Sequence, residues 1–256
     1  MARVSAAPPP DPDLGVLETV LVLDGRPVEL DAHLARLGNS LTELYGNPLP
    51  AGLAGAIEGR ARELGRGGLR VAVAPGDRAG LDATVVPAGL GPELALPSEP
   101  ALVTAHSLVL SSGLGPHKWA DRSLLDQAQA TLPEDAVALI VDWDGTVLEA
   151  ARGNVFAVIE GVLTTHPTDG RVLPGIARAR AIELAAAAGI PVREAALSRA
   201  EMIAAEEVFL TGSLRGVERV RELDGATLPK QGSISGSLAA GLREAWQPGL
   251  DRVSRR

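Results

Sequence analysis

Cysteine is absent from this chain of 256 residues. The absence excludes disulfides, thiolate metal sites and cysteine nucleophiles together. Histidine is rare as well, with four residues scattered at positions 33, 106, 117 and 166, so we do not expect a histidine metal site. Aromatic residues make up only 2% of the chain, which leaves Leu, Val, Ile and Ala to fill the core.

Basic residues are fewer than acidic residues in this chain. The chain has 24 Lys and Arg against 32 Asp and Glu, a formal net charge of −8. Nucleic-acid binding needs a basic face, so this balance argues against nucleic acid as the main partner. No apolar run is long enough to cross a membrane, and the first residues do not read as a secretory signal. We therefore expect a soluble cytoplasmic protein.

Lysine occurs only at Lys118 and Lys230, whereas Arg supplies the remaining positive charge. Arg does not lose its proton in proteins, but a partly buried lysine does. Lys118, beside Trp119, is therefore a candidate for Schiff-base formation or for general-base catalysis. The pattern predicts a helix from Lys118 to Thr131, and a helix N-terminus would lower the pKa of an ammonium group. The alternative is a surface lysine at a helix start.

Proline, glycine and apolar patterning predict a lead and two domains. Residues 1–13 read as a disordered lead, residues 14–112 as a small N-terminal domain, and residues 113–256 as a larger C-terminal domain. In the small domain, Asp31 is expected to cap a helix that Gly46 stops. A second helix over 53–64, strands at 16–23, 69–74 and 82–87, and a hairpin turn at Asp24-Gly25 complete this domain.

The C-terminal domain is predicted to combine short strands with helices. Pro174-Gly175 opens a helix that ends at Gly189, and Ser198-x-x-Glu201 forms a capping box. The expected strands are 137–141, 147–149, 155–159, 161–164, 207–210 and 216–223, and a closing helix covers 236–246. The whole pattern predicts an α+β fold.

Several residue types in this pattern suit an anionic cofactor. Arg36 lies on the flank of its helix, either as a solvated arginine or as one prong of an anion site. The helix start at Gly175 has free N–H groups that attract phosphate, although every helix has such a start. The Thr211-Gly212-Ser213 turn is either a simple loop or a second phosphate contact. Glu149 either caps a neighbouring strand or pairs with a protonated pyridine nitrogen.

Six segments of the chain occur in the order found in one enzyme family. They are Leu17-Glu18-Thr19, His33-Leu34-Ala35-Arg36-Leu37, Lys118-Trp119-Ala120-Asp121-Arg122, Glu149 followed by Asn154-Val155-Phe156, Leu173-Pro174-Gly175-Ile176-Ala177-Arg178, and Phe209-Leu210-Thr211-Gly212-Ser213-Leu214. With these segments the chain resembles the class IV aminotransferases. This pyridoxal-phosphate family of fold type IV includes branched-chain and D-amino acid transaminases and aminodeoxychorismate lyase.

The resemblance implies a two-domain α+β fold, with a small N-terminal α/β domain and a larger, β-barrel-like C-terminal domain with helices. It also implies pyridoxal 5'-phosphate as cofactor and a homodimer whose site lies between the domains. Lys118 would form the Schiff base and Thr19 would help to return a proton. The remaining cofactor contacts that it implies are Arg36, Glu149, Asn154, Gly175, Ile176, Ala177, Thr211, Gly212 and Ser213.

Within the family, the Lys-x-x-Asp-Arg segment and the run Ser213-Leu214-Arg215-Gly216 are most similar to aminodeoxychorismate lyases. The implied reaction, a step of folate biosynthesis, converts aminodeoxychorismate to 4-aminobenzoate and pyruvate. The implied partners are a small anionic substrate, either aminodeoxychorismate or an amino acid, and a chorismate-using synthase. A branched-chain or D-amino acid transaminase is the alternative.

Two other interpretations remain open. The run Val141-Asp142-Trp143-Asp144-Gly145-Thr146 fits the signature of a haloacid dehalogenase-type phosphatase that binds Mg²⁺, but Asp-Gly is also typical of a hairpin turn. The second interpretation is an inactive family member that serves as a binding module. It arises because Pro8 to Asp13 stand where family members usually have an extra strand and loop.

Overall fold

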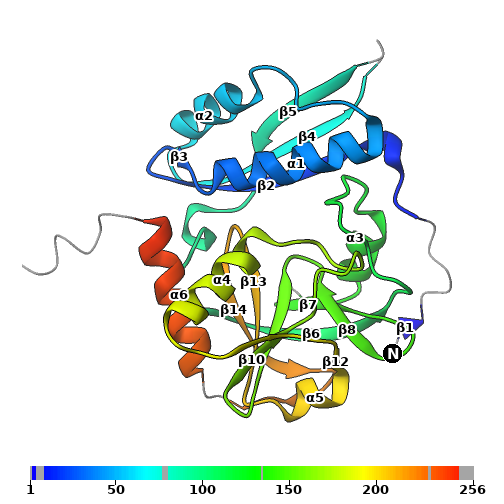
Figure 1. The fold of residues 1–256 in the computed structure, drawn as a ribbon, viewed down its shortest axis with the longest axis vertical. Helices are drawn as coiled ribbons and strands as arrows, with labels where there is room; N and C mark the ends of the chain where they lie inside the picture. Colours follow the sequence, from blue (N-terminus) through cyan, green and yellow to red (C-terminus); the bar gives the residue numbers. More distant parts are fainter. Residues whose placement is uncertain (1, 4–8, 77–79, 134, 230–231, 248–256) are drawn as a thin grey trace, which may run out of the picture. The chain divides into compact units, whose positions relative to one another are not determined.

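The structure is a computed structural model that describes residues 2–3, 9–76, 80–133, 135–229 and 232–247. The described chain forms two compact units. The smaller unit contains Pro9–Pro97 and His117–Arg122, and the larger unit contains Ser98–Pro116 and Ser123–Ala245. Both units combine helices with sheets, which confirms the predicted α+β class (Figure 1). None of the described helices is long and apolar enough to cross a membrane.

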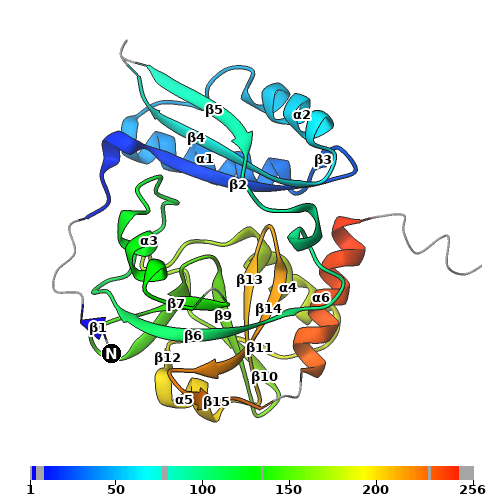
Figure 2. The same cartoon turned by 180° about the vertical axis from the view of Figure 1, so that it is seen from behind.

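The smaller unit is an antiparallel sheet with two helices on one face, as Figure 1 and Figure 2 show from opposite sides. Alternating apolar residues place Val20, Val71, Leu41 and Ile57 in the core between the sheet and the helices. The strand order is β3-β2-β4-β5. The elements are η1 Pro12–Leu14, β2 Val16–Leu23, β3 Arg26–Pro27, α1 Leu30–Tyr45, α2 Leu53–Leu64, β4 Gly67–Pro75, β5 Leu81–Pro87 and η2 Pro92–Leu94.

The limits of α1 differ from the prediction at one end. Gly46 ends the helix as predicted, in the left-handed conformation with φ of 67°. The prediction that Asp31 caps the helix is wrong, because α1 begins at Leu30 and Asp31 lies inside its first turn. Glu29 is the cap residue, and its left-handed backbone turns the chain from the β2–β3 hairpin into the helix.

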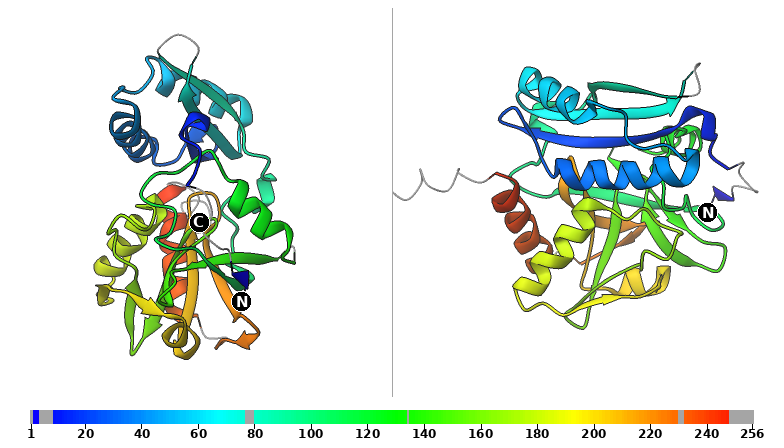
Figure 3. Two further views of the ribbon diagram at one scale, coloured as in Figure 1. Left: turned by 90° about the vertical axis from the view of Figure 1, so that its right-hand side faces the viewer. Right: turned by 45° about the horizontal axis from the view of Figure 1, so that its top comes forward.

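The larger unit is built on an 11-stranded sheet with the order β11-β10-β9-β13-β14-β6-β7-β8-β12, to which β1 and β15 add at β6 and β14. Helices α4 and α6 pack against each other, with Gly241 lying on Leu184, and Figure 3 shows them side by side. The strands are β1 Ala2–Arg3, β6 Ala101–Val109, β7 Ala136–Val141, β8 Thr146–Ala150, β9 Asn154–Ile159, β10 Val162–Thr165, β11 Val192–Glu194, β12 Leu197–Ser198, β13 Glu207–Gly212, β14 Gly216–Leu223 and β15 Ala226–Thr227. The helices are α3 Ser123–Ala130, α4 Ile176–Ala187, α5 Arg199–Ala204 and α6 Ser233–Trp246.

The two units divide the chain after Pro97, Pro116 and Arg122, whereas the sequence predicted one boundary at residue 113. Strand β6 pairs in parallel with β7 and β14, so the larger unit takes in residues from Ser98 onward. Residues His117–Arg122 return to the smaller unit, because the Lys118 carbonyl accepts a hydrogen bond from the Leu17 N–H of β2.

Part of the predicted disordered lead lies outside the described residues, namely residues 1 and 4–8. In the described part, β1 pairs in parallel with β6. Asp11 caps η1 by accepting a hydrogen bond from the Asp13 N–H. Within the described part of the lead, Ala2–Arg3 pair with a strand and Asp11 caps a helical turn.

Candidate active site

In the smaller unit, a buried carboxylate joins β2 to α1. Glu18 is 2% exposed and accepts hydrogen bonds from two residues one helical turn apart, His33 and Arg36. The Arg36 guanidinium donates from Nε at 2.7 Å and from Nη2 at 2.6 Å, one bond to each carboxylate oxygen. His33 Nδ1 lies 2.7 Å from Oε2. This forked geometry fixes the plane of the guanidinium.

The same contacts keep Glu18 ionised. Burial raises the pKa of this carboxyl, but the hydrogen bonds from His33 and Arg36 outweigh it and lower the pKa from its ordinary 4.5 to about 2. The sequence predicted Arg36 as a prong of an anion site or as a solvated arginine. In the structure, Arg36 forms an ion pair with Glu18. The residue pattern did not predict Glu18 as the partner of Arg36.

Lys118 lies in an irregular segment before α3 and not at a helix start. The predicted helix over 118–131 is wrong in its first turn, since α3 begins at Ser123. Trp119 forms an isolated antiparallel bridge with Val16. The Ala120 N–H donates to the Gly15 carbonyl at 3.0 Å. The expected effect of a helix terminus on the Lys118 amine therefore does not apply.

Thr19 lies two residues along β2 from Leu17, whose N–H donates to the Lys118 carbonyl at 2.7 Å. Since side chains alternate along a strand, Thr19 lies on the same face of β2 as Leu17. Glu18 lies on the opposite face, which packs on α1. Strand β2 therefore directs Thr19 and Glu18 to opposite faces, with Glu18 bound to α1.

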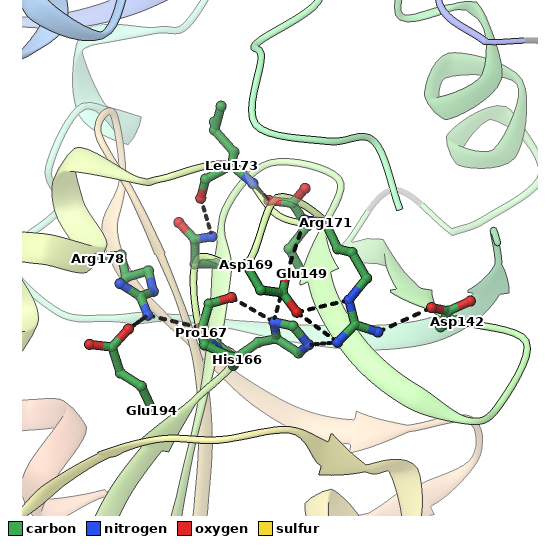
Figure 4. A network of polar contacts seen from close by, with 10 residues as sticks. Asp142, Glu149, His166, Pro167, Asp169, Arg171, Leu173, Arg178 and Glu194 are labelled. Carbon is green, nitrogen blue, oxygen red and sulfur yellow. Dashed lines mark hydrogen bonds and ion pairs between the residues drawn. The ribbon is translucent and has the colours of Figure 1, made fainter. Parts of the chain in front are cut away.

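In the larger unit, the peptide groups of Leu173 bind two predicted site residues (Figure 4). The Leu173 N–H donates to Glu149 Oε2 at 3.2 Å, and the Leu173 carbonyl accepts from Asn154 Nδ2 at 2.9 Å. Glu149 comes from β8 and Asn154 from the start of β9. Both side chains are buried, with 5% and 4% exposed. Leu173 therefore brings Glu149 and Asn154 together.

The start of α4 lies against the same cluster. Gly175 is the N-cap, and no side chain caps this helix end. The first N–H groups of a helix have no partner within it, and here they include those of Ile176 and Ala177. A Cβ atom at position 175 would clash with Asn154 Oδ1, so glycine permits this close approach. Pro174 precedes the cap and α4 ends at Ala187, two residues before Gly189.

The Thr211-Gly212-Ser213 segment, the third predicted phosphate contact, lies beside Asn154. Thr211 and Gly212 extend β13 further than predicted, pairing with Val217 and Gly216 of β14. Thr211 also pairs with Asn154 of β9. Its Oγ1 atom is buried and has no hydrogen-bond partner among the described residues. Ser213 follows in the tight turn to β14.

The acidic run at 142–144 forms a hairpin turn, as one of its two interpretations predicted. Strands β7 and β8 are antiparallel, and the Asp142 N–H donates to the Thr146 carbonyl across the turn. Asp142 Oδ2 is bound by Arg171 Nη1 at 3.2 Å. The residues that the structure describes contain no group of three or more His, Asp or Glu able to hold a metal. No residue pattern in the sequence predicted the Arg171 contact.

Comparison with known proteins gives one family. The model of the amino-transferase class IV family matches residues 15–223. The branched-chain-amino-acid aminotransferase of Escherichia coli (strain K12) is 40% identical over 103 residues, which cover 40% of this chain and 33% of that relative. The chain thus matches about a third of the length of this curated relative.

Two solved structures are similar over nearly the whole chain. The 4-amino-4-deoxychorismate lyase from Pseudomonas aeruginosa has a TM-score of 0.74 and 26% identity, with 93% of this chain and 91% of that chain covered. A hypothetical aminotransferase from Mycobacterium tuberculosis in its PLP-bound form has a TM-score of 0.76 and 24% identity. This similarity covers 100% of this chain and 96% of that chain, and it confirms the predicted fold.

Proposed function

Because the chain belongs to the class IV aminotransferase family, whose members are pyridoxal-phosphate-dependent enzymes, we propose that it is an aminodeoxychorismate lyase. The proposed reaction converts 4-amino-4-deoxychorismate to 4-aminobenzoate and pyruvate. The observation that carries the proposal is the similarity to the Pseudomonas aeruginosa lyase over 93% of the chain. That similarity covers both units, and its 26% identity is slightly above the 24% of the branched-chain aminotransferase structure from Thermoproteus uzoniensis, which covers 94% of the chain.

The residues of the larger unit fit the phosphate and ring of pyridoxal 5'-phosphate. The uncapped start of α4 offers the N–H groups of Ile176 and Ala177 to an anion. The buried Thr211 Oγ1 has no partner among the described residues, so it is available to a bound group. Gly175 permits the close approach of Asn154 to this helix start. We assign the phosphate to this group together with Gly212 and Ser213.

Glu149 is suited to hold the ring of the cofactor. A buried carboxylate beside a pyridine nitrogen favours the protonated ring. When it is bound, the cofactor supplies an electron sink for the substrate bond that breaks. Asn154 shares the Leu173 peptide groups with Glu149, and we assign it to the same contact region.

The smaller unit supplies the proton-transfer groups in this proposal. Lys118 holds the cofactor through Nζ and then removes the proton from the substrate ring carbon. Thr19 Oγ1 returns a proton to the departing three-carbon group. Arg36, oriented by Glu18, adds positive charge for the phosphate.

A transaminase is the second candidate, and a specific observation favours it. The segment matched by the branched-chain aminotransferase is 40% identical, a higher identity than the 26% of the lyase. The cofactor-binding residues are common to both activities, so they do not separate the candidates. The family resemblance further supports a homodimer, and a chorismate-using synthase as the source of the lyase substrate.

A single assay separates lyase from transaminase. Purified protein loaded with pyridoxal phosphate is incubated with aminodeoxychorismate, and pyruvate is measured with lactate dehydrogenase. The proposal predicts pyruvate and 4-aminobenzoate in equal amounts without any added keto acid. Turnover that appears only with an amino acid and a keto acid acceptor would establish the transaminase instead. Absence of both activities from cofactor-loaded protein would favour the inactive family member.

A further inference from the structure

Segment 166–173 joins β10 to α4, and it ends at the residue that binds both Glu149 and Asn154. The segment is neither helix nor strand. Its position therefore depends on side-chain contacts, and Figure 4 shows that most of these converge on Arg171.

Arg171 binds three side chains at once. Nη1 donates to Asp142 Oδ2 at 3.2 Å, while Nη2 donates to Asp169 Oδ2 at 2.8 Å and to His166 Nε2 at 3.1 Å. Nε also donates to Asp169, at 2.9 Å. Asp169 and His166 belong to the segment itself, whereas Asp142 lies outside it. The guanidinium therefore folds the segment on itself and ties it to the β7–β8 hairpin.

His166 is held in one tautomer by this arrangement. An arginine only donates, so the Nε2 atom facing Arg171 accepts and the proton lies on Nδ1. Nδ1 donates to the Pro167 carbonyl at 2.8 Å. The His166 carbonyl accepts from Arg178 Nη2 of α4 at 2.8 Å. His166 thereby connects the start of the segment to α4 as well as to Arg171.

Asp142 provides a fixed anchor. It is 6% exposed, and its Oδ1 atom accepts the backbone N–H groups of Ser112 and Trp143. It directly follows β7, the strand that pairs with β8, which carries Glu149. The contact between Arg171 and Asp142 therefore ties the segment bearing Leu173 to the hairpin bearing Glu149.

We propose that Arg171 is a positioning residue that locks segment 166–173 onto the β7–β8 hairpin, so that the Leu173 N–H orients the Glu149 carboxylate toward the cofactor ring. The assignment rests on the proposed function for the role of Glu149. It also gives the acidic run at 142–144 a structural purpose, the anchoring of Arg171. Arg171 itself touches neither cofactor nor substrate in this account.

The first test uses cofactor-free protein and amide hydrogen exchange. Arg171→Gln removes the charge and most of the donors, and we expect the Leu173 amide to exchange at least about tenfold faster. The matched control is Arg60→Gln, which removes an exposed arginine paired with Glu63 in the smaller unit and should leave Leu173 unchanged. Unchanged protection of Leu173 in Arg171→Gln would overturn the proposal. Circular dichroism verifies that each variant is folded.

The second test asks whether Arg171 acts through Glu149. Pyridoxal phosphate binding and the visible spectrum of the bound cofactor are measured for Glu149→Gln, Arg171→Gln and the double variant. We expect Arg171→Gln to raise Kd about tenfold in the native background and less than about twofold when Glu149 is already changed. Arg171→Lys, which keeps a charge near Asp142 without the fork, should fall between. Equal effects in both backgrounds would contradict the proposal.

The two tests separate this inference from the proposed function. If the native protein bound no pyridoxal phosphate, the proposed function would fail, and the exchange experiment would still decide whether Arg171 holds the Leu173 contact to Glu149. If the native protein binds the cofactor but the two changes act independently, the positioning role fails and the proposed function stands.

Discussion

At the scale of single residues, the buried Glu18 carboxylate binds two side chains of α1. It is an ion-pair partner for Arg36 and a hydrogen-bond acceptor for His33, on a strand that also contributes Val20 to the hydrophobic core of the smaller unit. Burying a charge is costly unless it is paired. The lowered pKa of Glu18 indicates that its two partners more than compensate for burial.

The lowered pKa makes a prediction about stability and pH. Because the folded-state pKa of about 2 lies below the ordinary 4.5, the ionised carboxylate stabilises the fold above pH 4.5. This stabilisation is lost as the pH falls from 4.5 toward 2. Glu18→Gln should therefore lower the free energy of unfolding at pH 7 by about 3 kcal/mol, and the difference from the native protein should shrink over that range.

Urea unfolding at several pH values measures this difference. Glu63→Gln is the matched control, since Glu63 is an exposed carboxylate paired with Arg60 one turn away, and it should change stability by less than about 1 kcal/mol. A gap between native protein and Glu18→Gln that stayed constant down to pH 2 would refute the assigned pKa.

Arg36 and Arg171 also show what residue patterns do not reveal. The spacing of leucines correctly placed Arg36 on a helix, but its partner lies 18 residues earlier, on a strand. Arg171 lies in a loop without periodicity, and its contacts reach Asp142, 29 residues away. Side-chain pairing across elements depends on how the elements pack, which a single sequence does not specify.

At the scale of elements, three chain segments meet where the phosphate is proposed to bind. The start of β9 carries Asn154, the end of β13 carries Thr211, and the start of α4 follows Gly175. The first two are paired directly in the sheet. The fit of glycine between Asn154 and α4 brings the third against them.

A substitution at Thr211, near the end of β13, should affect protein stability and pyridoxal phosphate binding differently. An unpaired buried hydroxyl costs free energy, so Thr211→Val, which keeps the branched shape, should leave the stability of cofactor-free protein unchanged or raise it by up to about 1 kcal/mol. The same change should weaken pyridoxal phosphate binding by about tenfold, because it removes one donor to the bound group. Thermal unfolding and a spectroscopic cofactor titration measure the two effects. Unaltered binding would remove Thr211 from the proposed phosphate contacts.

Elements were predicted well where local patterns decide them. The Asp24-Gly25 turn leads from β2 to β3, α2 covers Leu53–Leu64 as predicted, and the capping box of Ser198 and Glu201 is present at α5. These features depend on residues close together in the sequence. The helix expected from Lys118 failed at its start, because backbone bonds to Gly15 and Leu17, about a hundred residues away, hold His117–Arg122 in the smaller unit.

At the scale of the whole molecule, the candidate site residues belong to two units. Lys118, Thr19 and Arg36 belong to the smaller unit, and Glu149 and the remaining proposed phosphate contacts belong to the larger one. The order of motifs identified the family, since it does not depend on knowing the topology. The sheet order, in which β14 pairs with β6, joins strands more than a hundred residues apart, and local sequence patterns do not encode such pairings.

The central claim is that Lys118 holds pyridoxal 5'-phosphate, and an absorption spectrum tests it most directly. The native protein mixed with pyridoxal phosphate and freed of excess should be yellow, with a visible band that borohydride bleaches. Lys118→Ala should show no such band while its circular dichroism and thermal unfolding match the native protein. A native protein that stays colourless, or a Lys118→Ala variant with an unchanged band that borohydride still bleaches, would contradict the claim.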